Sequence, residues 1–97
     1  MSQESRIQTP ILHYLRSLIR CFAFKADVST RGIPDVICCY RGLFVSFEVK
    51  APGCHESPIQ LAVGLLLDRA EAHHYVVSRL TDVKSIMRAI DVEMEKR

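Results

Sequence analysis

The sequence predicts an α/β fold in which a mixed sheet is flanked by helices, and three patterns support this prediction. Apolar residues recur at helical spacing near both ends of the chain. Two apolar segments on either side of Arg41-Gly42 have the composition of a β-hairpin. A helix-start motif at residues 57–60 separates this hairpin from another short apolar segment. The expected order is α-β-β-β-α-β-α, which buries its apolar surface as a sheet covered by helices.

The first helix is predicted from a series of apolar residues at helical spacing: Ile7, Ile11, Tyr14, Leu15, Leu18, Ile19 and Phe22. Pro10 interrupts this series, and two arrangements fit it. Either the helix kinks at Pro10, or Thr9 caps a helix whose first residue is Pro10. Residues 22–26 are then predicted to form a short strand. Residues 27–33 contain Ser, Thr and Gly and are predicted to form a loop.

Residues 35–40 and 43–50 are predicted to be two strands joined by a tight turn at Arg41-Gly42. A two-residue loop pairs Tyr40 with Leu43, and a four-residue loop gives the same register. In that register Asp35 lies opposite Glu48, and opposed side chains project from the same face with Cβ atoms about 5 Å apart.

Alternation along residues 43–50 separates the two faces of the second hairpin strand. The apolar face holds Leu43, Val45, Phe47 and Val49, and the other holds Phe44, Ser46, Glu48 and Lys50. We therefore expect Glu48, Lys50 and Asp35 to project from one side of the sheet.

The second half of the chain is predicted to be helix, strand and helix. Residues 51–56 break the pattern with Pro and Gly. Ser57-Pro58-Ile59-Gln60 then combines a capping Ser, a Pro at the first helical position and a Gln at the capping-box position. This helix is expected to run to about Glu71, followed by a strand at residues 75–78. A last helix begins at Thr81 or Asp82, and its apolar face comprises Val83, Ile86, Met87, Ile90 and Met94.

Length and composition predict one domain spanning residues 1–97, because 97 residues are too few for two. A net charge of +2 permits binding to nucleic acid without demanding it. The four cysteines, Cys21, Cys38, Cys39 and Cys54, form no CxxC pair or zinc pattern and are expected to be reduced. The sequence shows no signal peptide or membrane-spanning stretch, so an intracellular protein is expected.

Two carboxylates that face each other across a sheet repel and destabilise it unless something compensates their charge. A divalent cation removes the repulsion between Asp35 and Glu48, and oxygen ligands suit Mg²⁺ or Mn²⁺. Lys50 adds a positive charge where a phosphate group would lie. The alternative is a surface salt bridge between Lys50 and these acids. Neither Pro-Asp nor Glu-x-Lys is specific alone; the combination, in register on a hairpin, indicates a metal site.

Gly32-Ile33-Pro34-Asp35 followed by Phe47-Glu48-Val49-Lys50 resembles the motifs of the PD-(D/E)XK nucleases, and more narrowly of the virus-type replication-repair nuclease (VRR-NUC) domain. The resemblance extends to Glu4-Ser5-Arg6-Ile7-Gln8 and to Ser57-Pro58-Ile59-Gln60, and covers the chain from Glu4 to about Ser78. It is to the minimal, stand-alone form of the domain. It implies a restriction-endonuclease-like α-β-β-β-α-β core with a C-terminal helix.

The resemblance also implies a metal-dependent phosphodiesterase that uses Mg²⁺ or Mn²⁺ and no organic cofactor. Its metal ligands would be Asp35, Glu48, the Val49 carbonyl and Glu4. Lys50 would orient or activate the attacking water, and Gln60 would reach the site from the second helix. Glu4 and Gln60 each have a second explanation. An acid in the first turn of a helix is favoured by the helix dipole, and Gln60 completes a capping box by itself.

The partner that the resemblance implies is DNA, with Arg6, Lys25 and Arg31 as candidate phosphate contacts. Stand-alone members of the family act as dimers on branched DNA such as four-way junctions. A homodimer is therefore expected, with an apolar strip of the first or last helix as its interface, in a bacterial or phage replication and repair setting.

Three alternatives remain open at this point. The first is a nuclease of the same fold that trims flaps or ends. The second is a catalytically silent DNA-binding module, and the third is a protein–protein adaptor with a fortuitous motif. The complete set of Glu4, Asp35, Glu48 and Lys50 favours an active enzyme over a silent module.

Overall fold

The computed structural model of the chain describes residues 2–27 and 29–97. Within these ranges the elements are α1 (Gln3–Arg16), β1 (Cys21–Lys25), β2 (Val36–Tyr40), β3 (Leu43–Val49), α2 (Pro58–Arg69), β4 (His73–Val77) and α3 (Leu80–Glu95). This is the order that the sequence predicted. No helix in the described part of the chain is both long enough and apolar enough to cross a membrane.

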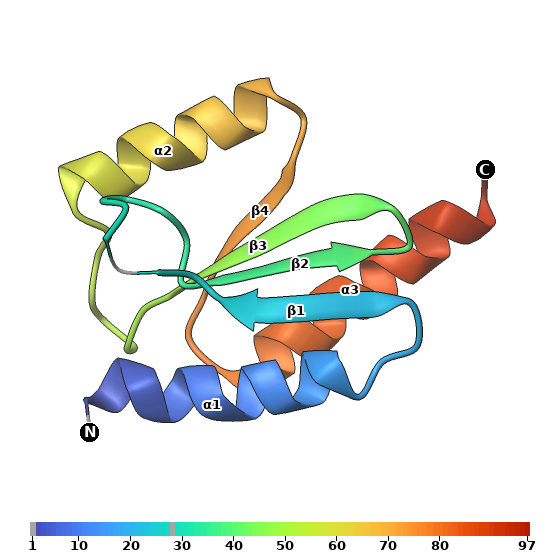
Figure 1. Cartoon of the computed structure of the whole chain (residues 1–97), viewed down its shortest axis with the longest axis horizontal. Helices are drawn as coiled ribbons and strands as arrows, with labels where there is room; N and C mark the ends of the chain where they lie inside the picture. The colour runs from blue at the N-terminus through green and yellow to red at the C-terminus, as the bar shows by residue number, and fades with distance from the viewer. Residues whose placement is uncertain (1, 28) are drawn as a thin grey trace.

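The four strands form one mixed sheet in the order β1-β2-β3-β4. The first three are antiparallel neighbours, whereas β4 runs parallel to β3. Helices α1 and α3 pack against one face of the sheet, and α2 lies over the other (Figure 1). The predicted class, a mixed sheet flanked by helices, is confirmed.

The main core lies between the sheet and the pair α1 and α3. Its fully buried sheet residues include Val45, Phe47 and Val49 of β3, as the alternation predicted. They pack with Ile11 of α1 and Met87 of α3. Burying a side chain of this size stabilises the fold by about 1.5–3 kcal/mol. The apolar faces of the two helices are therefore buried in the core and stabilise the domain.

The β2–β3 hairpin has the predicted two-residue turn. Arg41 and Gly42 both have left-handed backbone angles, φ +53° and +84°, which suit the right-handed twist of a hairpin. Tyr40 pairs with Leu43, and the ladder continues to Val36 and Phe47. Because the turn is local in sequence, it fixes the register of every pair between the two strands.

The first helix rules out one of the two arrangements that Pro10 suggested, a helix that starts at Pro10 with Thr9 as its cap; a kink at Pro10 stays a prediction. It begins at Gln3, capped by Ser2, whose Oγ accepts a hydrogen bond of 3.0 Å from the Ser5 amide. The helix continues through Pro10, so Thr9 is not its cap. A proline inside a helix costs about 3 kcal/mol. The burial of Ile11 and Leu15 in the core offsets this cost.

Other boundaries also shift, those of β1, β2 and β3 by a single residue. Helix α1 ends at Arg16, so Leu18, Ile19 and Phe22 of the predicted series lie beyond it. Helix α2 ends at Arg69 rather than Glu71. Strand β4 begins two residues earlier than predicted because parallel pairing with β3 extends it. Helix α3 begins at Leu80, one residue before the earlier of the two predicted starts.

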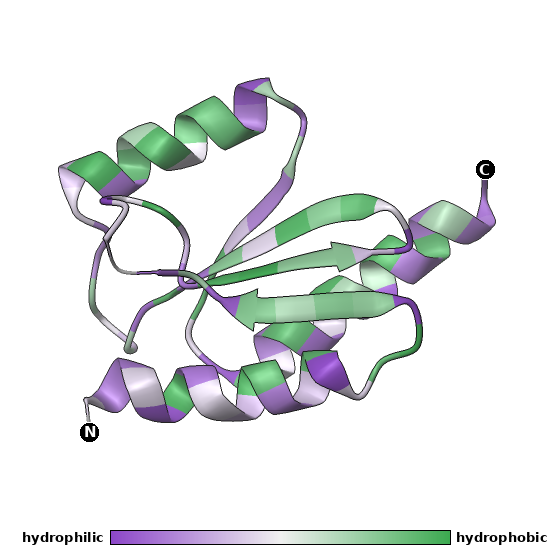
Figure 2. Cartoon of the chain, in the orientation of Figure 1, coloured by the Kyte–Doolittle hydropathy of each residue, from purple (hydrophilic) through white to green (hydrophobic). Residues whose placement is uncertain are grey.

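Helix α2 is rich in hydrophobic residues (Figure 2), and several apolar side chains of α2 and of the sheet face toward it are exposed. Large exposed side chains there are Ile59, Leu61, Leu65 and Leu66 on α2 and Phe22, Phe24, Phe44 and Val76 on the strands. We call this set the α2–sheet surface. Most of the apolar residues of α1 and α3 lie in or against the core, and the interface expected on one of these helices stays a prediction.

Candidate functional site

The two predicted acids meet where β2 and β3 begin to separate. The ladder pairs Val36 with Phe47, and one further step brings Asp35 opposite Glu48. The Asp35 carboxylate accepts a hydrogen bond through Oδ2 from the Val49 amide, at 2.8 Å. This bond holds one oxygen of Asp35 against the β3 backbone. The register that the sequence predicted for this pair is therefore the one in the structure.

Glu48 is a buried acid with only 1% of its surface exposed. Burial is the main cause that raises the pKa of its carboxyl group to about 9. Hydrogen bonding to Asp35 and the negative charge of Asp35 raise the pKa further, whereas the charge of Lys50 lowers it. Charge on both carboxyl groups is costly when they lie side by side and one of them is buried.

Gln60 contacts Glu48 from the first turn of α2. Its Nε2 donates a hydrogen bond of 3.0 Å to Glu48 Oε1. The amide oxygen accepts from the Ser57 amide at 2.8 Å, while the Gln60 amide donates to Ser57 Oγ. This is the predicted capping box, and it orients the side-chain amide so that its NH₂ group faces Glu48. The capping box is confirmed and leaves Gln60 in contact with Glu48, while a catalytic role of Gln60 stays a prediction.

Lys50 lies directly after β3 and is partly buried. Its amide donates to the Val77 carbonyl at 2.9 Å, which continues the parallel pairing by one residue. The alternation of β3 therefore carries over to Lys50, whose side chain leaves the sheet on the side of Glu48. Its positive charge acts directly on the Glu48 carboxyl group.

Gly32 brings the loop before Asp35 into contact with α2. Its φ is +80°, and a Cβ on this residue would lie 2.9 Å from the Ile59 carbonyl oxygen and 2.8 Å from Val63 Cγ2. A residue with a side chain would therefore be strained in its backbone and would collide with the helix. This contact fixes the distance between the Asp35 segment and the first turn of α2, which carries Gln60.

The donor set at this site fits Mg²⁺ or Mn²⁺. Among the described residues, no group of three or more His, Cys, Asp or Glu side chains is placed to hold a metal ion. Mg²⁺ is commonly held by only one or two protein carboxylates, with water and substrate phosphate completing its shell. The buried, mutually repelling Asp35 and Glu48 are such a pair, so the residues present are compatible with this ion.

The other predicted residues are not drawn into the same cluster. Glu4 is a partly buried residue in the first turn of α1, and no hydrogen bond joins it to the two acids. Arg6, Lys25 and Arg31 are exposed on α1, at the end of β1 and in the following loop. None takes part in the described ion pairs, which join Arg41 of the hairpin turn to two acids of α3. Their roles stay predictions.

Sequence reasoning missed two features of this face. The charge of Glu56 raises the pKa of Glu48. The Oε2 atom of Glu56 is buried and has no hydrogen-bond partner among the described residues. Ser46 is fully buried and lies 2.8 Å, Oγ to Nδ1, from His74 of β4. No local pattern indicates either contact, since each joins segments that only the fold brings together.

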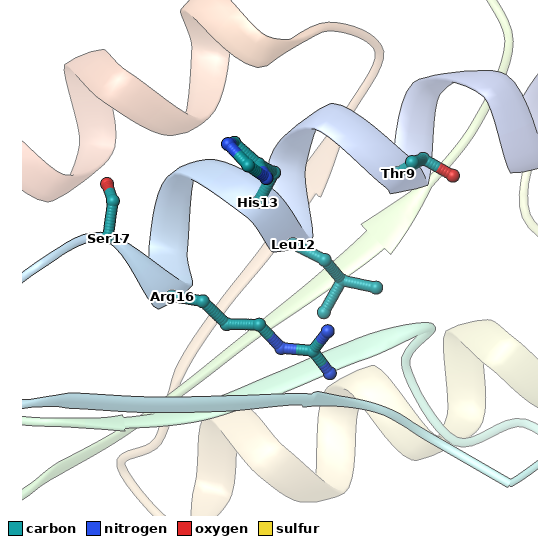
Figure 3. Close-up of a pocket in the computed structure, with 5 residues that line it drawn as sticks. All are labelled: Thr9, Leu12, His13, Arg16 and Ser17. Carbon is teal, nitrogen blue, oxygen red and sulfur yellow. The ribbon is translucent and has the colours of Figure 1, made fainter.

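Gln8, which belongs to the resemblance near the start of the chain, is buried on the face of α1 that holds Ile11 and Leu15. Its Oε1 has no hydrogen-bond partner among the described residues. A hollow along α1 is lined by Thr9, Leu12, His13, Arg16 and Ser17 (Figure 3). It contains none of the predicted site residues and does not mark the site.

Comparison with known proteins identifies the fold. No protein-family model and no curated protein matches the chain. A solved structure described as a VRR-NUC domain superimposes with a TM-score of 0.78 and 23% identity, over 91% of this chain and 97% of its own. The chain has the VRR-NUC fold. A second VRR-NUC domain protein matches with a TM-score of 0.72 and 15% identity, over 92% of this chain and 88% of its own.

The VRR-NUC fold is the one that the motifs around Asp35 and Glu48 implied. It accounts for the parallel addition of β4 to the hairpin and for α2 on the face that carries the acids. At these identities the likeness establishes architecture, and the chemistry must be argued from the side chains.

Proposed function

We propose that this VRR-NUC-fold protein is a metal-dependent DNA endonuclease that hydrolyses phosphodiester bonds. The observation that carries the proposal is the buried Glu48, which is hydrogen bonded to Gln60 and faces Asp35. A buried acid with a strongly perturbed pKa beside a second acid is typical of functional sites. Such a pair would reduce the stability of an adaptor or a purely structural module without any benefit. Its presence therefore favours an enzyme.

Each residue of the site has a proposed role. Asp35 and Glu48 hold Mg²⁺ or Mn²⁺, with the Val49 carbonyl and Glu4 as further ligands. A bound divalent ion supplies a water of lowered pKa and stabilises negative charge on the phosphate. Lys50 orients the attacking water and neutralises phosphate charge. Gln60 keeps the Glu48 carboxyl group in one orientation.

Substrate binding is assigned to basic residues outside the acid pair. Arg6, Lys25 and Arg31 are exposed and are proposed to contact DNA phosphates, which positions a duplex without reading its sequence. We propose branched DNA, such as a four-way junction, as the preferred substrate. The proposal follows from the resemblance to stand-alone VRR-NUC domains.

A homodimer is part of this proposal, since a junction with two-fold symmetry needs two related cuts and a C2 dimer supplies two sites. The support for self-association is the α2–sheet surface, where Leu65 and Leu66 each expose more than 60% of their surface. Contiguous apolar patches of this kind are uncommon on monomers. The dimer interface is therefore proposed to lie there and not on α1 or α3.

Cleavage of labelled four-way junction, flap and linear duplex DNA in Mg²⁺ or Mn²⁺ tests the proposal. We expect wild type to cut, and Asp35→Ala and Lys50→Ala to lose at least a hundredfold in rate. Glu93→Ala and Lys96→Ala are matched controls on the exposed end of α3 and should cut like wild type. Circular dichroism confirms that each variant is folded.

The preferred DNA separates the alternatives that share this fold. Faster cutting of flaps or ends than of junctions indicates a processing nuclease. If wild type binds DNA but never cuts, and the Asp35 and Lys50 variants bind equally well, the endonuclease proposal is wrong and the chain is a DNA-binding module.

A further inference from the structure

His74 fills the space between the sheet and α2. It lies on β4 as the register partner of Ser46 on β3, and the Ser46 hydroxyl is 2.8 Å from its Nδ1. On its other side the imidazole meets Gly64 of α2. A Cβ built on Gly64 would lie 3.2 Å from Nε2 and 3.3 Å from Cδ2 of His74. The ring is therefore packed between a buried serine of the sheet and the backbone of the helix.

Few residues of α2 are buried: Gly64 is buried, Gln60, Val63 and Leu67 are half-buried, and the others are exposed. Gly64 is the buried residue of α2, a helix that the structure describes from end to end. The leucines at positions 61, 65 and 66 are largely exposed and do not anchor the helix. The first turn of α2 has two further contacts: Gln60 donates a hydrogen bond to Glu48, and Ile59 lies against Gly32 of the preceding loop. The imidazole ring therefore contributes to the separation of helix and sheet at the buried residue of α2.

This contact lies beside the hydrogen bond that joins α2 to the acid pair. Gly64 is four residues after Gln60, on the same face of the helix and about 6 Å farther along it. Ser46 is two residues before Glu48, on the same face of the strand and about 7 Å away. The two cross-links, Gln60 to Glu48 and Gly64 through His74 to Ser46, therefore run in parallel between the same helix and strand.

We infer that His74 is a positioning residue, which holds α2 at the distance from the sheet that lets Gln60 reach Glu48. The expected effect of His74 on cleavage rests on the proposed nuclease function. Its expected effect on the position of Gln60 does not. Without the ring, α2 loses its contact with the sheet at Gly64, and the 3.0 Å bond between Gln60 Nε2 and Glu48 Oε1 is lost or weakened. A Cβ on Gly64 disturbs the same spacing from the helix side.

The first test compares His74→Ala with His73→Ala. His73 is the neighbouring residue on β4 but projects to the opposite face, where its Nδ1 lies 3.3 Å from the Tyr75 hydroxyl. In metal-free protein, the side-chain amide signal of Gln60 in a ¹H–¹⁵N spectrum reports its bond to Glu48 directly. We expect this signal to move to the position of a solvent-exposed glutamine in His74→Ala and to stay in place in His73→Ala.

Gly64→Ala provides an independent perturbation that leaves the imidazole in place. It should shift the Gln60 signal in the same way, because the added methyl group is closer to the ring than ordinary packing allows. Combining Gly64→Ala with His74→Ala should disturb the signal less than the two single effects together, since removal of the ring makes room for the methyl group. An unchanged Gln60 signal in folded His74→Ala or Gly64→Ala overturns the inference.

Cleavage kinetics supply the functional arm of the test. Loss of a residue that orients a site residue commonly costs 10–100-fold, so we expect kcat to fall about tenfold or more in His74→Ala with KM little changed. In a Gln60→Ala background the same substitution should have no further effect on kcat. Equal losses in both backgrounds indicate general destabilisation and contradict the inference. If wild type does not cut DNA at all, the function is wrong while the Gln60 signal still decides the role of His74.

Discussion

Replacing Glu48 by Gln in the metal-free protein should change how stability depends on pH. The pKa of this carboxyl group is raised to about 9 in the folded protein, chiefly by burial, from an ordinary value of 4.5. Between these two pH values the folded protein keeps a proton that the unfolded chain releases. The free energy of unfolding must therefore fall as pH rises, and the stabilisation is complete only below the unfolded pKa.

The size of the effect follows from the difference between the two pKa values. Each unit corresponds to about 1.4 kcal/mol, so the contribution lost between pH 4.5 and pH 9 has an upper limit of roughly 6 kcal/mol. Water entering the site would reduce this value. Typical domains are stable by only 5–15 kcal/mol, so even a third of the limit is easily measured. The Glu48→Gln side chain keeps the shape of glutamate but does not ionise. The free energy of unfolding of this variant should therefore lack the part of its pH dependence that comes from Glu48.

Urea denaturation at pH 5.5 and pH 8.5 in a chelating buffer measures the effect. We expect wild type to lose stability relative to Glu48→Gln as pH rises. Glu93→Gln, on the exposed part of α3, serves as the control and should follow wild type. Parallel pH dependences of wild type and Glu48→Gln would refute the reasoning, because they would mean that Glu48 titrates normally in the folded protein.

Three further predictions concern the metal, the loop before Asp35 and the α2–sheet surface. Binding of Mg²⁺ at pH 7 should release a proton, and calorimetry in buffers of different ionisation enthalpy should show it; an enthalpy independent of buffer contradicts this. Gly32→Ala should lower the rate of cleavage at least tenfold, whereas Gly42→Ala, which has similar φ and open space around it, should cost stability only; equal rates would contradict the packing argument. Leu65→Glu should shift the mass measured by light scattering from dimer to monomer, and Val92→Glu on α3 should not; the reverse result would place the interface on α3.

Features with a local cause were predictable from the sequence. The Arg41-Gly42 turn sets the hairpin register over two adjacent strands, and this register brings Asp35 opposite Glu48. The capping box at the start of α2 depends on residues three apart. In both cases the interacting groups are close along the chain, so short-range geometry suffices to place them.

The predictions that failed involved contacts between distant segments. Thr9 does not cap a helix at Pro10, because the helix already begins at Gln3 and its residues Ile11 and Leu15 are buried in the core. Most apolar residues of α2 are exposed, and the helix approaches the sheet through Gly64, which no local pattern indicated. Periodicity alone gives a helix its apolar face but not the surface which that face contacts.

The sequence by itself determined the order of elements, the hairpin register and the identity of the acid pair. Only the tertiary structure decided the parallel pairing of β4 with β3, the bond from Gln60 to Glu48 and the place of His74 beneath α2. It also decided that Glu48 is buried, and this burial raises the pKa of its carboxyl group. The physical reason is that turns, caps and alternation act between near neighbours, whereas burial and the charge around a buried acid depend on segments that meet only in the folded chain.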